Sequence, residues 1–216
     1  SVNNAFHPEG GIRLLQGNLG RSLIKTSAVA KERQRITAQA VVISDQAELK
    51  ALFERGELDR DCVVVARFQG PAANGMPELH QLMPILGVLQ DRGYAVALVT
   101  DGRLSGASGK VPAAIHVTPE AAKGGAIGRI QDGDMISLDV AAGELRVAVD
   151  EQILADRPHP DTPMARNTVG RGLFKFSREV VTDAESGGCT LFEPLVMDDL
   201  PQGQSARDIA YEHCAS

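Results

Sequence analysis

A run of apolar residues at 95–100 ends directly in a glycine-rich loop at 101–110, and this junction constrains the fold more than any other stretch. An unbroken run of this length, rich in branched side chains, is typical of a buried strand. The loop glycines permit backbone conformations closed to other residues and let a ligand approach closely. Between them stand charged and hydroxyl residues: Asp101, Arg103, Ser105, Ser108 and Lys110. We therefore expect a binding site at the end of a buried strand, with a solvated turn as the alternative.

The spacing of this loop can be compared with three known glycine-loop chemistries. A phosphate-binding P-loop requires G-x-x-x-x-G-K-[ST], whereas here Lys110 is followed by Val111. A nucleophile elbow requires a glycine two residues before and two after the serine, but Ser105 has Arg103 and Ala107 there. The G-x-G-x-x-G dinucleotide pattern is absent as well. What remains is a loop that offers a serine, an arginine and a lysine, which suits an oxygen-rich anionic ligand.

The remaining pattern predicts an α/β domain with a mixed or barrel-like sheet and short flanking helices. Further strands are expected at 12–20, 22–26, 38–44, 61–68 and 113–117, and a hairpin at 135–149. Helices are expected at 45–56, from Pro77 with a kink at Pro84, after Thr118, after Asp150 and over 171–181. We expect one domain over 1–216, with its core at about 10–156 and a linker, a helix and a loose tail at 157–216.

Two strand-end loops, 69–77 and 101–112, occupy comparable places in this pattern. If their strands are neighbours, Glu78 and Ser105 face one cavity, because ligands favour the carboxyl ends of such strands. An acid in the first turn of a helix is also favoured by the helix dipole alone, so Glu78 has a structural alternative. Lys25 and His116 are further candidates for the site. The structural alternative is a solvated lysine for Lys25 and a hydrogen-bonded core histidine for His116.

Composition excludes several classes of protein. The formal net charge of −6, with no long basic run, argues against nucleic-acid binding. No apolar run approaches 18 residues and no secretory leader is visible, so we expect no membrane partner and a cytoplasmic location. Cys62, Cys189 and Cys214 are far apart and form no C-x-x-C pair, so neither a disulfide scaffold nor a cysteine metal cluster is indicated.

Three segments carry a resemblance to a known family: 100–122, the motif Asn-Gly-Met-Pro-Glu-Leu at 74–79, and Asp-Gly-Asp at 132–134. They resemble the dihydroxy-acid and 6-phosphogluconate dehydratase family over about 10–150. The Ser-Gly-Ala-Ser-Gly-Lys-Val-Pro version at 105–112 is similar to the branch that acts on 6-phosphogluconate in the Entner-Doudoroff pathway. The resemblance implies the C-terminal domain of a hydro-lyase, a swivelling β/β/α barrel, either as a fragment or encoded separately.

The resemblance also implies roles for residues. Ser105 would be the general base at C2 of a sugar-acid phosphate, and Glu78 a ligand of Mg2+. A 4Fe-4S iron–sulfur cluster would be held by the N-terminal domain of the same enzyme. That domain would be a partner of this one, and the whole enzyme would form a homodimer. We expect Lys110 and Arg103 to bind the 6-phosphate, and Ser108 and Asp101 to contribute to the substrate site. Two alternatives stay open: a non-catalytic lid or ligand-binding module, which the missing cluster cysteines favour, and a dihydroxy-acid dehydratase of branched-chain amino-acid synthesis, against which Lys110 argues.

Overall fold

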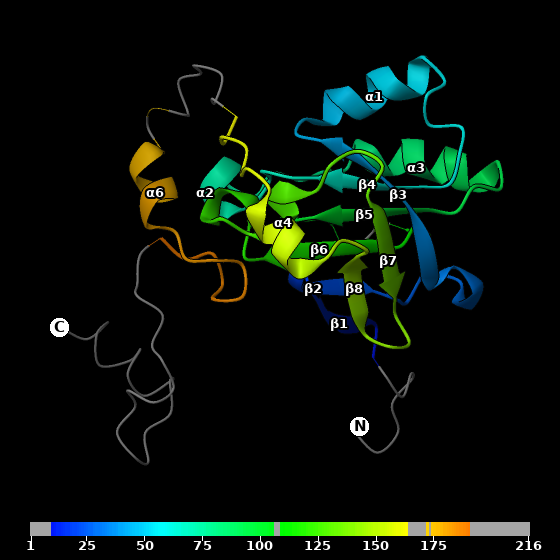
Figure 1. The fold of residues 1–216 in the computed structure, drawn as a ribbon, viewed down its shortest axis with the longest axis horizontal. Coiled ribbons are helices and arrows are strands. Elements are labelled where there is room, and N and C mark those ends of the chain that lie inside the picture. The colour runs from blue at the N-terminus through cyan, green and yellow to red at the C-terminus, as the bar shows by residue number, and fades with distance from the viewer. Residues whose placement is uncertain (1–9, 106–108, 164–171, 173, 191–216) are drawn as a thin grey trace, which may run out of the picture.

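Eight strands close into a barrel in a computed structural model that describes residues 10–105, 109–163, 172 and 174–190 (Figure 1). The order around the barrel is β1-β2-β6-β5-β4-β3-β7-β8. In chain order the strands are β1 (Ile12–Gly17), β2 (Gly20–Lys25), β3 (Arg35–Ile43), β4 (Cys62–Ala66), β5 (Val96–Thr100), β6 (Ala113–Thr118), β7 (Met135–Asp139) and β8 (Glu144–Val147). The sheet is mixed, with β3, β4, β5 and β6 parallel to one another. The predicted mixed α/β barrel is confirmed.

The two central strands, β4 and β5, are buried on both faces, and this explains their continuous apolar sequences. Val63 and Val65 of β4 point into the barrel core. Cys62 and Val64 alternate with them and pack outward, in a second apolar cluster between the sheet and the helices. Burying each such valine stabilises the fold by about 1.5–3 kcal/mol.

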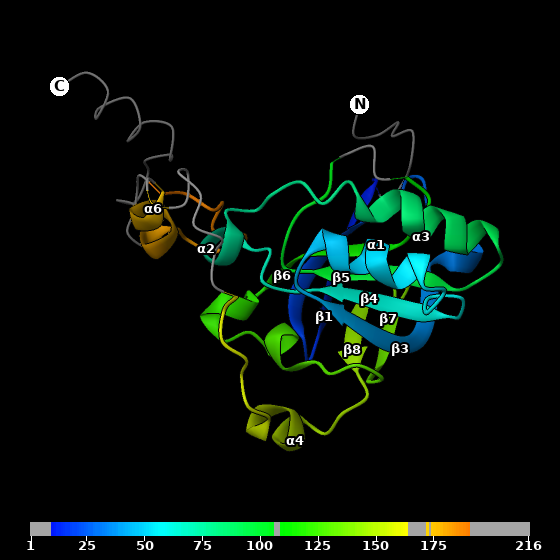
Figure 2. The same ribbon diagram turned by 90° about the horizontal axis from the view of Figure 1, so that it is seen from above.

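Helices α1 (Gln46–Glu54) and α3 (Leu82–Asp91) lie over the outer face of this part of the barrel (Figure 2). The helix predicted at 45–56 is confirmed, and Asp45 is its N-cap. The Asp45 side chain accepts a hydrogen bond from the Ala47 N–H at 2.7 Å, and the Glu48 carboxylate accepts one from the Ser44 N–H at 3.2 Å. Gly56, at φ 73°, follows the helix as expected for a C-terminal glycine.

The helix predicted to begin at Pro77 with a kink at Pro84 begins later, so this prediction is wrong. α3 begins at Leu82, and Pro84 lies in its first turn. Because the N–H groups of a first turn have no partner within the helix, a proline there breaks nothing. Residues 77–80 are therefore free of the helix, and Glu78 forms an isolated β-bridge with Arg103.

Short helical turns join the other strands. They are η2 (Lys31–Arg33), α2 (Pro71–Asn74), η3 (Ala121–Lys123) and η4 (Ala126–Arg129). The helix predicted to start with Thr118 as its N-cap is also displaced, because Thr118 is the last residue of β6. The short helix η3 begins after Glu120 and ends at Gly124, at φ 82°.

The second half of the chain follows the prediction more closely. β7 and β8 form the expected hairpin, and the Asp150 side chain caps α4 (Glu151–Asp156). α6 (Lys175–Val180) lies within the helix predicted at 171–181, of which 171 and 173 are outside the described residues. Residues 191–216, which include the predicted loose tail and Cys214, are also outside them. In the part of the chain that is described, no helix has the length and apolar character that a membrane crossing needs.

Candidate functional site

The loops after β4 and β5 leave the barrel at the same edge, because these strands are parallel neighbours with Ala66 beside Thr100. The Thr100 hydroxyl donates to the Ala66 carbonyl at 2.6 Å and accepts from the Gly102 N–H at 2.9 Å. A Cβ at Gly102 would lie 2.7 Å from the Gln69 Cβ, so the close approach of the two loops requires glycine there. The ends of β4 and β5, with the residues that directly follow them (66–69 and 100–102), therefore form one rigid unit, which we call the platform.

Glu78 and Ser105 come together on this platform, although 27 positions separate them in the sequence. Glu78 Oε1 accepts a hydrogen bond from the Ser105 backbone N–H at 2.7 Å, and Glu78 Oε2 pairs with Arg103 Nη1 at 3.0 Å. Arg103 Nε also donates to the Met76 carbonyl at 2.8 Å. The carboxylate therefore fixes the backbone that carries Ser105, so the two residues are neighbours. Glu78 is not among the residues that line the cavity of Ser105, so the shared cavity stays a prediction.

The Asp101 carboxylate lies beneath this pair, in the interior of the protein. It accepts hydrogen bonds from the N–H groups of Gln69 at 2.8 Å, Phe68 at 3.2 Å and Ala121 at 2.9 Å. Burial raises the pKa of Asp101 to about 6, against the opposing effect of these three donors. Asp101 was predicted to contact substrate, but here it is fully buried and ties three loops together, so in this conformation it positions the site.

Glu120 adds a second buried carboxylate to the same platform. It accepts from the N–H groups of Ala72 at 2.8 Å and Ala73 at 3.2 Å, at the start of α2. Among the described residues, the non-glycine residues with positive φ are Phe68, Met76 and His116, and all three lie in or beside these loops. Unfavourable backbone conformations of this kind cluster at functional sites, where the surrounding structure holds them in place.

Ser105 lines a cavity of about 190 Å³ together with Lys25 and His116, and otherwise mainly with apolar side chains. Burial and the nearby Arg103 guanidinium lower the pKa of His116, which favours the neutral imidazole. Lys25 comes from the end of β2, which pairs with β6. The structure therefore places Lys25 and His116 in the same cavity as Ser105, the predicted general base. The sequence pattern could not decide whether either residue lies at the site.

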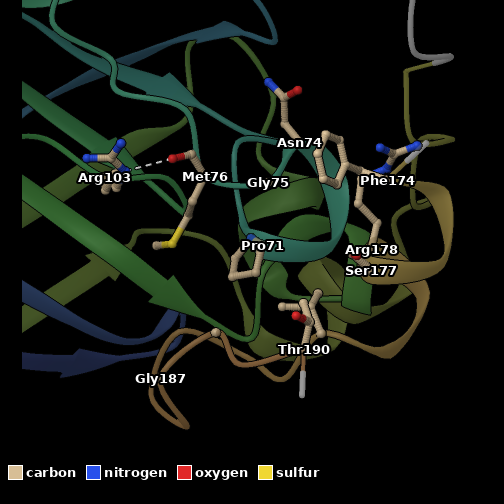
Figure 3. Close-up of a pocket in the computed structure, with 12 residues that line it drawn as sticks. Pro71, Asn74, Gly75, Met76, Arg103, Phe174, Ser177, Arg178, Gly187 and Thr190 are labelled. Atoms are coloured by element: carbon tan, nitrogen blue, oxygen red, sulfur yellow. Dashed lines mark hydrogen bonds between the residues drawn. The ribbon is translucent and has the colours of Figure 1, made fainter. Parts of the chain in front are cut away.

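A larger cavity of about 610 Å³ has Arg103 in its lining (Figure 3). We call it the outer cavity. It lies between the loop after β4 and the segment around α6, and its lining includes Asn74, Met76, Phe174 and Arg178. The sequence pattern missed Arg178, because α6 is far from the glycine loop along the chain. A signal was available in the amphipathic pattern at 171–181, which places an arginine beside the aromatic residue that lines the cavity.

The remaining predicted substrate contacts have different outcomes. The ammonium group of Lys110 pairs with Asp91, the last residue of α3. Lys110 is not among the residues that line either of the two cavities described above. Exposed ion pairs are weak, so its role in substrate binding stays a prediction. Ser108 lies outside the described residues.

Glu78 fits a contribution to a Mg2+ site. Its side chain is 25% exposed, and each oxygen accepts one hydrogen bond, whereas a carboxylate can accept about four. The described residues contain no group of three or more His, Cys, Asp or Glu side chains that could hold a metal ion. Mg2+ commonly takes one or two carboxylates and completes its shell with water and substrate oxygens. Glu78 would therefore be one ligand among several, and Arg103 would share its carboxylate.

The described cysteines do not fit an iron–sulfur cluster. Cys62 is fully buried in β4, and burial raises the pKa of its thiol to about 11, whereas cluster ligands are thiolates. Cys189 lies in the loop after α6 and is partly buried. Cys62 is therefore a core residue.

The fold and the site therefore define a closed α/β barrel that holds a serine, a carboxylate and an arginine together at one edge. The family follows from comparison with known proteins. A family model described as dihydroxy-acid/6-phosphogluconate dehydratase C-terminal matches residues 1–188, and the chain belongs to this family.

Three relatives illustrate the similarity. The phosphogluconate dehydratase of Pseudomonas aeruginosa is 55% identical over 195 residues, which cover 90% of this chain and 32% of the relative. The phosphogluconate dehydratase of Escherichia coli K12 is 56% identical over 195 residues, which cover 89% of this chain and 32% of the relative. A dihydroxy-acid dehydratase of Archaeoglobus fulgidus is 38% identical over 194 residues, which cover 88% of this chain and 35% of the relative. The chain spans about a third of the length of the curated relatives it matches.

Proposed function

We propose that this chain is the C-terminal domain of a phosphogluconate dehydratase, a hydro-lyase that converts 6-phospho-D-gluconate to 2-dehydro-3-deoxy-6-phosphogluconate and water. The contact between Glu78 and the Ser105 N–H carries the proposal, because it brings the predicted base and the predicted metal ligand together. The higher identity to phosphogluconate dehydratases than to the dihydroxy-acid dehydratase supports this substrate class.

In this proposal Ser105 Oγ takes the proton from C2 of the substrate. The electrons of the C2–H bond form a double bond between C2 and C3, and the C3 hydroxyl leaves as water after gaining a proton. The resulting enol then tautomerises to the 2-keto acid. Each atom is accounted for, and the reaction needs no oxidant or reductant.

A serine hydroxyl is a weak base at neutral pH, so its environment must lower its pKa. The positive charge of Arg103 lies two residues away and is held by Glu78. His116 lines the Ser105 cavity, but its lowered pKa favours the neutral form, so it adds no positive charge to stabilise an alkoxide at Ser105. Mg2+ held in part by Glu78 would supply further stabilisation of negative charge on oxygen.

The rest of the enzyme enters as part of the same proposal. We place the 4Fe-4S cluster in an N-terminal domain, since the described cysteines of this chain do not suit it. The proposed partners of this chain are that N-terminal domain and, in a homodimer, a second copy of the complete enzyme. The 216-residue chain by itself is then a substrate-binding domain without turnover, which accommodates the view of it as a lid or binding module.

Substrate choice tests the proposal. The complete enzyme containing this chain, loaded with iron, sulfide and Mg2+, is assayed on 6-phosphogluconate and on a branched 2,3-dihydroxy acid. We expect kcat/KM for 6-phosphogluconate to be higher by at least about a hundredfold, because a site built for charged hydrogen bonds discriminates strongly against a ligand without them. A preference for the branched acid would instead support a dihydroxy-acid dehydratase.

A further inference from the structure

The outer cavity contains a second cationic side chain that the sequence motifs do not point to. Arg178 of α6 lines it, together with the hydroxyl residues Ser177 and Thr190 and the amide of Asn74 (Figure 3). The described lining contains no aspartate or glutamate. A cavity with cationic, hydroxyl and amide groups and no carboxylate suits an anion.

The two arginines of this cavity come from different elements of the fold. Arg103 is held by the Glu78 carboxylate and the Met76 carbonyl, which offset its charge and fix its position near Ser105. Arg178 is half-buried and belongs to a separate element, α6, which packs beside α2. In Figure 3 the two guanidinium groups lie at opposite sides of the cavity. Arg103 therefore lies at one end of the cavity and Arg178 at the other, while Ser105, two residues after Arg103, lines the smaller cavity.

We propose that Arg178, with the hydroxyl groups of Ser177 and Thr190, binds the phosphate group of the substrate in the outer cavity. The inference rests on the proposed function, whose substrate carries its reacting carbons and its phosphate at opposite ends. With C2 at Ser105, the carbon chain runs past Arg103, and the phosphate lies at the α6 end. Arginine suits this role, since its planar guanidinium can donate two parallel hydrogen bonds to a phosphate.

This assignment differs from the expectation that Lys110 binds the phosphate. Lys110 pairs with Asp91 at the end of α3 and does not line the outer cavity. Phosphate recognition therefore moves from the glycine loop to a segment more than 60 residues further along the chain.

The test uses Arg178→Gln in the complete enzyme, with 6-phosphogluconate and gluconate as substrates. KM for 6-phosphogluconate should rise by about tenfold to a hundredfold, the usual effect of losing a charged hydrogen bond. KM for gluconate should change less than about twofold, and Arg178→Lys should recover part of the loss. Lys175→Gln is the matched control: it removes one charge from the same helix, at an exposed residue that pairs with Glu179 and does not line the cavity.

Equal changes of KM for both acids, or no change for either, would overturn the inference. A selective loss in Lys110→Ala with none in Arg178→Gln would also overturn it. Binding of inorganic phosphate to the 216-residue chain, measured by NMR titration, separates this inference from the proposed function. If the complete enzyme does not dehydrate 6-phosphogluconate, the proposed function fails, but phosphate binding that is lost in Arg178→Gln and kept in Lys175→Gln would still support the anion site.

Discussion

Replacing Ser105 by alanine is expected to lower kcat of the complete enzyme on 6-phosphogluconate by about 10²- to 10⁴-fold, the usual contribution of a general base. The loop should keep its conformation, because Glu78 bonds to the backbone N–H of residue 105 and the serine side chain is exposed. Steady-state kinetics and the thermal unfolding temperature of the same preparation measure both effects. KM should change much less than kcat, since the hydroxyl acts in the transition state.

Ser27→Ala is the matched control, because Ser27 is an exposed serine in the turn after β2, outside both cavities. It should leave kcat and the unfolding temperature unchanged. If Ser105→Ala keeps more than about a tenth of the wild-type kcat, the base is another group, and Lys25 or His116 in the same cavity would be examined next.

Replacing Asp101 by alanine is expected to lower the free energy of unfolding by on the order of 3 kcal/mol at pH 5. The change removes the acceptor for three backbone N–H groups that lie in the interior, and an unsatisfied buried donor is costly. Urea unfolding of the 216-residue chain measures the difference. Asp91→Ala is a suitable control, because its exposed ion pair with Lys110 should contribute less than about 1 kcal/mol.

The contribution of Asp101 should depend on pH in a defined direction. Its pKa is raised by burial from 3.8 to about 6 in the folded protein, so the folded state holds a proton that the unfolded state has lost. The stabilising contribution of Asp101 is therefore greatest below pH 3.8 and declines as the pH rises through about 6. Between pH 5 and pH 8 the advantage of the wild type over Asp101→Ala should shrink by roughly 1 kcal/mol. An advantage that grows over this range would contradict the buried-carboxylate account.

Much of the barrel could be predicted because its central strands are buried on both faces and therefore have unbroken apolar sequences. The neighbourhood of Glu78 and Ser105 followed from the same pattern, since parallel neighbours end at one edge of the sheet. The start of α3 could not be predicted from Pro77, because a proline fits an extended segment as well as a first helical turn. The β-bridge of Glu78 with Arg103, a contact between distant segments, favours the extended segment over the helical turn here.

The site was harder to predict where a role depends on such distant contacts. An aspartate in a glycine-rich loop suggests a ligand contact, but Asp101 turns inward because three N–H groups from two other loops converge on it. Lys110 has the right charge at the right end of the motif, yet Asp91 of α3 attracts it. The amphipathic pattern at 171–181 places Arg178 beside Phe174, but only the packing of α6 beside α2 brings it near the loop after β4.

A double-mutant cycle tests most directly whether Glu78 and Ser105 work as one site. Values of kcat on 6-phosphogluconate are measured for Ser105→Ala, Glu78→Gln and the double variant of the complete enzyme. If the carboxylate acts by positioning and activating the serine, the double variant should lose about as much as Ser105→Ala alone, as groups that act as a unit do. Losses that multiply, so that the two free-energy changes simply add, would show that the two residues act independently and would contradict this account.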